Sequence, residues 1–170
     1  MYDYGSCSEQ VLIRRAKRGD TKAFSQLYAK IYKDLYKFAY YMTGQTQDAE
    51  DAVSDAVLAA FENIHKLKKE TAFRSWMFTI LANTCRRKLR RQEQNVELED
   101  NLAAEETDYA RTQDVREAFG RLEVTDRLIV GWSVLGGYSS DEISEMLDMK
   151  AATVRSRKSR ALGRLRQMLE

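Results

Sequence analysis

The most constraining feature of this sequence is a long apolar repeat between Asp20 and Gly44. Its apolar residues recur at steps of three and four over about six helical turns. They are Phe24, Leu27, Tyr28, Ile31, Leu35, Phe38, Ala39 and Met42. This period matches one face of an α-helix and does not match the alternation of a strand. The sequence therefore predicts one long core helix, capped by Asp20 and ended by Gly44, on which other elements must pack.

The rest of the chain has the same helical character. Proline is absent from all 170 residues, although an average usage of about 5% would give several. Apolar stripes of helical period recur in residues 47–66 and 72–91, each preceded by a threonine that can cap a helix, Thr46 and Thr71. Strand-like alternation is scarce. We therefore predict an all-α fold.

Charge is segregated along the chain, although the formal net charge is only +2. Residues 86–91 carry five basic side chains and no acid, whereas residues 92–117 carry nine acids against two arginines. A basic helix follows near the C-terminus. Such alternation indicates a protein that binds a polyanion and whose acidic segment masks the total charge.

The acidic segment also divides the chain. Residues 93–111 are weakly periodic and are predicted to form a flexible tether. On this interpretation residues 1–92 form one small helical domain and residues 112–170 form a second. The second domain must bury its few large apolar side chains together, because a domain of that size buries only a small apolar core.

The end of the second domain has the pattern of a helix-turn-helix. Ser139 and Glu142 fit a capping box that opens a short helix, and a basic helix follows from about residue 151. Its face opposite Val154 presents Arg155, Ser156, Ser159 and Arg160. Arginine can bond guanine and serine can bond either base type in the major groove, so this face is predicted to bind duplex DNA. Arg157 and Lys158 flank the buried face and are poorer candidates.

A second nucleic-acid surface is predicted on the helix over residues 72–91. Arginine holds phosphates, tryptophan stacks on an exposed base and asparagine bonds a base edge. The residues that fit these roles are Trp76, Asn83, Arg86, Arg87, Arg90 and Arg91. A core tryptophan at the edge of a solvated helix would explain Trp76 equally well, but it would not explain the cluster of arginines.

An acidic stripe lies on the helix over residues 47–66. Asp48, Asp51 and Asp55 fall within a narrow arc of one face. A solvated face and a docking surface for a basic partner protein explain this stripe about equally well from the residues alone. Like charges on one helix face repel one another by a few tenths of a kcal/mol per pair.

Four segments together resemble a known family over nearly the whole chain. They are residues 20–28 (DTKAFSQLY), residues 47–53 (QDAEDAV) with Ala59-Ala60-Phe61, residues 73–83 (FRSWMFTILAN) and residues 137–157. In this order and spacing they are similar to the extracytoplasmic-function (ECF) type of bacterial sigma factor in the sigma-70 family. The chain departs from the family at Asp148, where a turn glycine is usual, and at Lys150, which is a poor helix cap.

The resemblance implies a mechanism of transcription initiation with two partners, core RNA polymerase and promoter DNA. Asp48, Asp51 and Asp55 would dock on the clamp helices of the largest polymerase subunit. The C-terminal helix would bind the minus-thirty-five element as duplex. The helix carrying Trp76 and Asn83, with the loop before it, would hold a base flipped from the minus-ten element. An anti-sigma factor is a further candidate partner.

The sequence also limits the other classes of function. It has one histidine, no glycine-rich phosphate loop and no plausible pair of nucleophile and base, so we predict no catalytic residues and no small-molecule substrate. The only cysteines, Cys7 and Cys85, are far apart, and we predict no metal site and no cofactor. Without an apolar signal core or membrane span, a cytoplasmic protein with no membrane insertion is expected.

Two other functions stay open at this point. One is a conventional dimeric helix-turn-helix regulator, which would bind a palindrome and use the first domain for dimerisation or sensing. The other is a sigma-like interaction module that binds polymerase without starting transcription. The arginine-rich end of the helix over residues 72–91 favours a sigma factor, because a sensing domain has no need of it.

Overall fold

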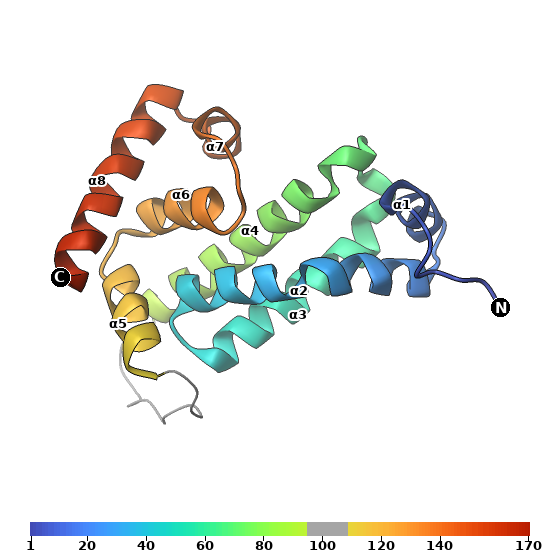
Figure 1. Ribbon diagram of the computed structural model, residues 1–170, viewed down its shortest axis with the longest axis horizontal. Coiled ribbons are helices and arrows are strands. Elements are labelled where there is room, and N and C mark those ends of the chain that lie inside the picture. The colour runs from blue at the N-terminus through green and yellow to red at the C-terminus, as the bar shows by residue number, and fades with distance from the viewer. Residues whose placement is uncertain (95–108) are drawn as a thin grey trace.

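The computed structural model describes residues 1–94 and 109–170, and these residues form helices with no strand (Figure 1). The prediction of an all-α fold is confirmed. The two chain ends lie at opposite ends of the long axis (Figure 1). Two short 3-10 turns, Ile64–Lys66 and Glu70–Ala72, join α3 to α4. In chain order the helices are α1 (Glu9–Lys17), α2 (Thr21–Thr43), α3 (Thr46–Asn63), α4 (Phe73–Gln94), α5 (Tyr109–Gly120), α6 (Val124–Val134), α7 (Ser140–Leu147) and α8 (Ala151–Leu169).

Helix α2 is the centre of the fold. It begins at the predicted cap, where the Asp20 carboxylate accepts hydrogen bonds from the backbone N–H groups of Lys22 and Ala23. It ends at Gly44 in the left-handed conformation, at φ 76°. Its predicted apolar face is buried, apart from the half-buried Tyr28. Helices α1, α3, α4, α5 and α6 all contact it, which confirms that the other elements pack around this repeat.

Several helix ends differ from their predicted positions. Gln45, not Thr46, is the residue that precedes α3, and its side chain makes no capping bond. Helix α4 continues to Gln94 and α5 already begins at Tyr109. Helical structure therefore reaches into both ends of the predicted tether, because the glutamine and arginine residues there are good helix formers. The middle of that tether lies outside the described residues.

The C-terminal helices pack directly on the N-terminal ones, and one continuous apolar core joins the two groups. The rings of Phe38 in α2 and Trp132 in α6 stack with centroids 6.4 Å apart. Tyr41 in α2 and Phe119 in α5 lie 5.6 Å apart. Gly131 permits this approach, since a Cβ atom there would lie 2.8 Å from the Phe38 ring. A side chain at residue 131 would therefore push α6 away from α2.

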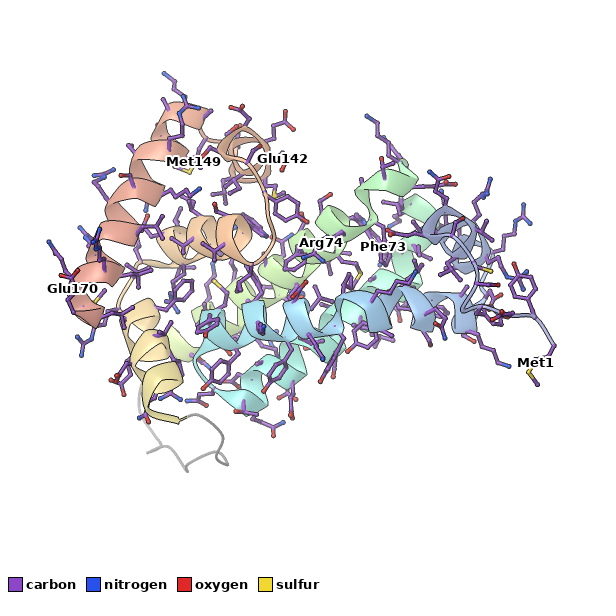
Figure 2. The ribbon with its side chains drawn as sticks, viewed as in Figure 1. Met1, Phe73, Arg74, Glu142, Met149 and Glu170 are labelled. Atoms are coloured by element: carbon purple, nitrogen blue, oxygen red, sulfur yellow. The ribbon has the colours of Figure 1, made fainter. Side chains whose placement is uncertain are left out.

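Arginines from both groups of helices form polar contacts across this packing. Arg74 in α4, which is labelled in Figure 2, is one of them. It donates to the Asp34 carboxylate at 3.0 Å and approaches the carbonyl of Leu135 at the end of α6, at 3.4 Å. From the other side, Arg127 in α6 donates to the carbonyl of Met42 at 2.8 Å. These contacts fix how α6 lies against α2 and α4.

Not every polar atom in this packing is satisfied. The indole N–H of Trp132 and the hydroxyl of Tyr138 are buried and make no hydrogen bond within the described part of the chain. Burial raises the pKa of Tyr138 to about 12, so the phenol is neutral. Each buried donor without a partner costs about 1–3 kcal/mol. The packing between the two groups of helices is therefore apolar and close, but less stable than its ring contacts alone suggest.

Candidate nucleic-acid and polymerase interfaces

Helices α7 and α8 form the predicted helix-turn-helix. The capping box is confirmed: the Ser139 hydroxyl accepts from the Glu142 N–H at 3.2 Å, and the Glu142 carboxylate accepts from the Ser139 N–H at 3.0 Å. Asp148 ends α7 in the left-handed conformation, at φ 52° and ψ 50°. Aspartate tolerates this conformation better than most side chains. The turn between α7 and α8 thus forms without the glycine that is usual in the family.

The four predicted base-contacting residues of α8 all lie on its exposed face. Val154 and Ala161 face inward, at 0% and 1% exposed, and α5, α6 and α7 pack against that inner side. The exposed residues are Arg155, Ser156, Ser159 and Arg160. Because the buried stripe fixes the rotation of α8, one face of the helix carries donors and hydroxyls into solvent.

The arginines of this face are held only weakly within the protein. Arg155 lies 3.8 Å from the Asp141 carboxylate, with side chains 60% and 84% exposed. Arg160 makes a 3.4 Å contact with the carbonyl of Ser156 one turn earlier. Exposed contacts of this kind contribute about 0–1 kcal/mol. Both guanidinium groups can therefore exchange these contacts for phosphate or base atoms at little cost.

Arg157, which the sequence predicts to be a poorer base-contacting candidate, has a different position. Its Nε donates to the Asp126 carboxylate at 2.7 Å and its Nη2 donates to Glu123 at 2.9 Å. The bond to Asp126 is the main reason that the pKa of Arg157 is raised. Asp126 is only 9% exposed, so this pair ties α8 to the start of α6.

Helix α4 carries the second predicted surface. Asn83 is exposed, and Trp76 is half-buried with its ring centroid 6.3 Å from that of Phe73. Part of the indole is thus anchored in the protein and part is accessible. Among the arginines that follow on the same helix, Arg86 is half-buried. Arg87, Arg90 and Arg91 are exposed. The structure therefore brings the predicted aromatic, amide and cationic groups to the uncovered side of α4.

One side of α4 was not recognised from the sequence. Phe78 and Ala82 are both fully buried, and Phe78 packs edge-on against Phe38 at 5.6 Å and Tyr138 at 6.1 Å. These two residues lie one turn apart, on a flank of α4 that belongs neither to its inner apolar face nor to its polar face. Their apolar spacing of four residues was the available signal.

The acidic stripe on α3 is partly neutralised by α4. The Asp48 carboxylate accepts from the Gln92 side chain at 2.6 Å, and Asp55 pairs with Lys88 at 3.3 Å. Asp51 is exposed and accepts from the Gln47 side chain of its own helix at 3.1 Å. Asp51 is therefore the member of the stripe whose charge is best presented to a partner.

Comparisons with known proteins place both halves of the chain in one family. Residues 27–94 match the model of sigma-70 region 2, and residues 112–165 match that of sigma-70 region 4. The ECF RNA polymerase sigma factor SigM of Mycobacterium tuberculosis (strain H37Rv) is 32% identical over 166 residues, which cover 95% of this chain and 85% of SigM. SigW of Bacillus subtilis, another ECF sigma factor, is 25% identical over 92% of this chain and 94% of its own.

Two solved structures have a similar fold. CnrH, determined in complex with the cytosolic domain of CnrY, has a TM-score of 0.71 and 25% identity, covering 95% of this chain and 96% of that chain. The sigma factor RpoE, determined in complex with the anti-sigma factor NepR from Bartonella quintana, has a TM-score of 0.76 and 24% identity, covering 88% and 98%.

A folded region 2, a folded region 4 with its helix-turn-helix, and relatives matched along nearly their whole length define a transcription initiation factor. The chain belongs to the ECF sigma factors of the sigma-70 family. It binds core RNA polymerase and directs it to promoter DNA.

Within the described ranges, 1–94 and 109–170, no helix is both long enough and apolar enough to cross a membrane.

Proposed function

We propose that the exposed surfaces of α3, α4 and α8 make different contacts in transcription initiation. Residues 1–92 bind polymerase and the minus-ten element, residues 112–170 bind the minus-thirty-five element, and residues 93–111 connect them. The observation that carries this proposal is the segregation of side chains: the acids gather on α3, while exposed donors and cations gather on α4 and α8.

Helix α8 supplies sequence-specific contact with duplex DNA. Its first two turns carry Arg155 and Ser156 on the exposed side, the part of a recognition helix that enters the major groove. Arg155 is positioned to bond a guanine edge, with Ser156 and Ser159 alongside it and Arg160 one turn further on. Arg157 keeps the helix at a fixed angle through Asp126.

Replacing Arg155 by alanine is expected to weaken binding of the minus-thirty-five duplex by about 1–3 kcal/mol and to relax preference at one base pair. Within the described ranges the Arg155 side chain has one long contact, to Asp141, so the fold should keep its melting temperature. Binding of the promoter and of single-base variants, measured at one fixed salt concentration, checks this. An equal loss on every variant would instead assign Arg155 to a phosphate.

Helix α4 supplies the opening of the duplex. Flipping a base from the minus-ten element costs a few kcal/mol of stacking. A partly exposed indole such as that of Trp76 can recover about 1–3 kcal/mol by stacking on that base. Asn83 lies on the same side and can bond a base edge, while Arg86, Arg87, Arg90 and Arg91 hold the backbone. Capture of the flipped base then favours the melted state.

Replacing Asn83 by alanine is expected to slow promoter opening by about tenfold, because one hydrogen bond to the captured base is lost. Closed-complex formation should change little, since it depends mainly on phosphate contacts and α8. Permanganate reactivity of the melted strand, followed over time, measures opening. A normal rate of opening would contradict the role of Asn83.

The two groups of helices must move apart for both promoter elements to be contacted at once. The elements lie about 25 base pairs apart, or about 85 Å along straight B-DNA at 3.4 Å per base pair. A compact protein of this length has a radius of gyration of about 16 Å and is about 40 Å across. The packing of α6 on α2 therefore belongs to the free protein, and binding to polymerase and promoter breaks it.

The setting and partners follow from the same assignment. The protein acts in the cytoplasm, where polymerase and chromosome are found, and it catalyses no reaction of its own. An anti-sigma factor is a third partner: CnrH and RpoE, which share the fold, were both determined with a second protein bound.

The decisive experiment is run-off transcription with core polymerase and DNA from upstream of this protein's own gene. A discrete transcript that requires the protein is expected. Binding to a palindromic site as a dimer, with no effect on core polymerase, would overturn the proposal in favour of a conventional regulator.

A further inference from the structure

The connection between α3 and α4 is a short loop, residues 64–72, that carries exposed cations. Its two 3-10 turns are Ile64–Lys66 and Glu70–Ala72. Ile64 and Leu67 point inward, at 3% and 4% exposed. The exposed side chains between and beside them are His65, Lys66, Lys68 and Lys69. This loop leads directly into the first turn of α4, which carries Trp76.

Helix α1 lies against this loop and contacts both of its 3-10 turns. The two segments are far apart in sequence but adjacent in space, at the end of the molecule that holds the N-terminus (Figure 1). Helix α1 precedes the segment that matches sigma-70 region 2, which begins at residue 27. The family match therefore assigns no role to α1.

One side chain joins α1 to the middle of the loop. The Lys17 ammonium donates to the carbonyl of Leu67 at 2.6 Å. Lys17 is half-buried and Leu67 is buried, so this charge-assisted bond is shielded and stronger than one in water. Because Leu67 lies inward between Lys66 and Lys68, holding its carbonyl fixes both neighbouring lysines on the outer side.

Helix α1 is itself a rigid support. Leu12, Ile13 and Ala16 are at most 1% exposed in the core. Its last turn is fixed to the start of α2, since Arg15 donates to Asp20 at 2.8 Å, and Asp20 caps α2. The position of Lys17 is thus set by packing on one side and by an ion pair on the other.

We propose that Lys17 is a positioning residue for promoter opening, which holds the loop of residues 64–72 in the shape that captures the flipped minus-ten base. This rests on the proposed function of α4, into whose first turn the loop leads. Lys17 does not touch DNA. It acts by keeping the loop ordered before the base arrives. Binding of the base then does not have to supply the free energy of ordering the loop.

The test is Lys17→Met in the full-length protein bound to core polymerase. Methionine keeps a long apolar side chain but lacks the donor. Opening of the promoter found by the run-off assay, followed by permanganate reactivity, should slow about tenfold, the size expected for loss of one charge-assisted hydrogen bond. The preference for that promoter over one with a substituted minus-ten base should fall as well. Lys17→Arg keeps a donor and should restore much of both.

The control is Lys30→Met, which removes an exposed lysine from α2 and should change neither rate nor preference. Opening at the wild-type rate by Lys17→Met would overturn the proposal. So would an equal slowing on both promoters, which is the result of a general loss of structure. If the wild-type holoenzyme opens no promoter, the proposed function itself fails, and the two failures are thereby distinguished.

Discussion

Replacing Asp51 by arginine is expected to reduce the affinity for core RNA polymerase by at least about 100-fold, because it places a like charge against a basic docking surface at a cost of several kcal/mol. Asp51 is exposed on α3, and among the residues that the structure describes its side chain bonds that of Gln47, one turn away. The substitution should therefore leave the melting temperature and the circular dichroism spectrum of the free protein nearly unchanged. Co-purification with core polymerase, followed by a titration, measures the loss.

Glu50→Arg is the matched control for Asp51→Arg. Glu50 is the neighbouring exposed acid on α3, about 100° around the helix, and its substitution makes the same change in charge at nearly the same point of the helix dipole. A loss confined to Asp51→Arg identifies a docking face. Equal losses of polymerase affinity from both variants would show that the effect comes from net charge alone. Unchanged co-purification of Asp51→Arg would exclude the docking role.

The other two aspartates of the stripe make poorer tests, for a structural reason. Asp55 pairs with Lys88, and Asp48 accepts from Gln92. Reversing either charge would disturb the contact between α3 and α4, and with it the arginine-rich end of α4. A loss of polymerase binding in those variants would therefore have two inseparable causes, lost docking and a local change of fold.

The sequence predicted the helices and the exposed faces because both depend on local periodicity. The stripe on α2 and the buried Val154 of α8 fix which side of each helix is covered. Once the covered side is known, the exposed positions of Asn83 and Arg155 follow. The capping box at Ser139 was equally local, since both of its bonds span three residues.

Contacts between helices distant in sequence were beyond such reasoning. Phe78 lies on a flank of α4 outside the predicted inner face, and it is buried because α6 and the segment after it reach α4 from about 60 residues away, as the Arg74 to Leu135 contact shows. The Lys17 bond to Leu67 spans 50 residues. The sequence spacing of Arg74 and Leu135, or of Lys17 and Leu67, does not predict either contact. Packing of α6 on α2 depends on Gly131, whose lack of a side chain matters only against Phe38.

The contact at Gly131 also makes the packing between the two groups of helices testable. A Cβ atom at residue 131 would have Phe38 ring atoms as its three nearest neighbours, the first at 2.8 Å. Phe38 is 0% exposed, so its ring has no free space into which to move. Within α6 itself, a longer side chain is favourable, since glycine is the poorest helix former after proline. The conflict thus arises only when α6 lies on α2.

Gly131→Gln is accordingly expected to separate the two groups of helices without unfolding either. Small-angle scattering should show the radius of gyration rise by several ångströms from about 16 Å. The Trp132 N–H and the Tyr138 hydroxyl are buried without a hydrogen bond among the described residues. They lower the cost of this separation, because water can reach both once the surfaces part. Affinity for core polymerase should rise about fivefold, since binding no longer has to break the packed state.

Gly163→Gln is the matched control for Gly131→Gln, because a Cβ atom at Gly163 in α8 would meet nothing within 4 Å. It should leave the radius of gyration and the affinity for polymerase unchanged. An expanded Gly131→Gln that bound polymerase no more tightly than wild type would show that the packed state does not oppose polymerase binding. A compact Gly131→Gln would show that Phe38 yields to the new side chain. The first result would remove the packing of α6 on α2 as a barrier to polymerase binding, and the second would remove the requirement for glycine at residue 131.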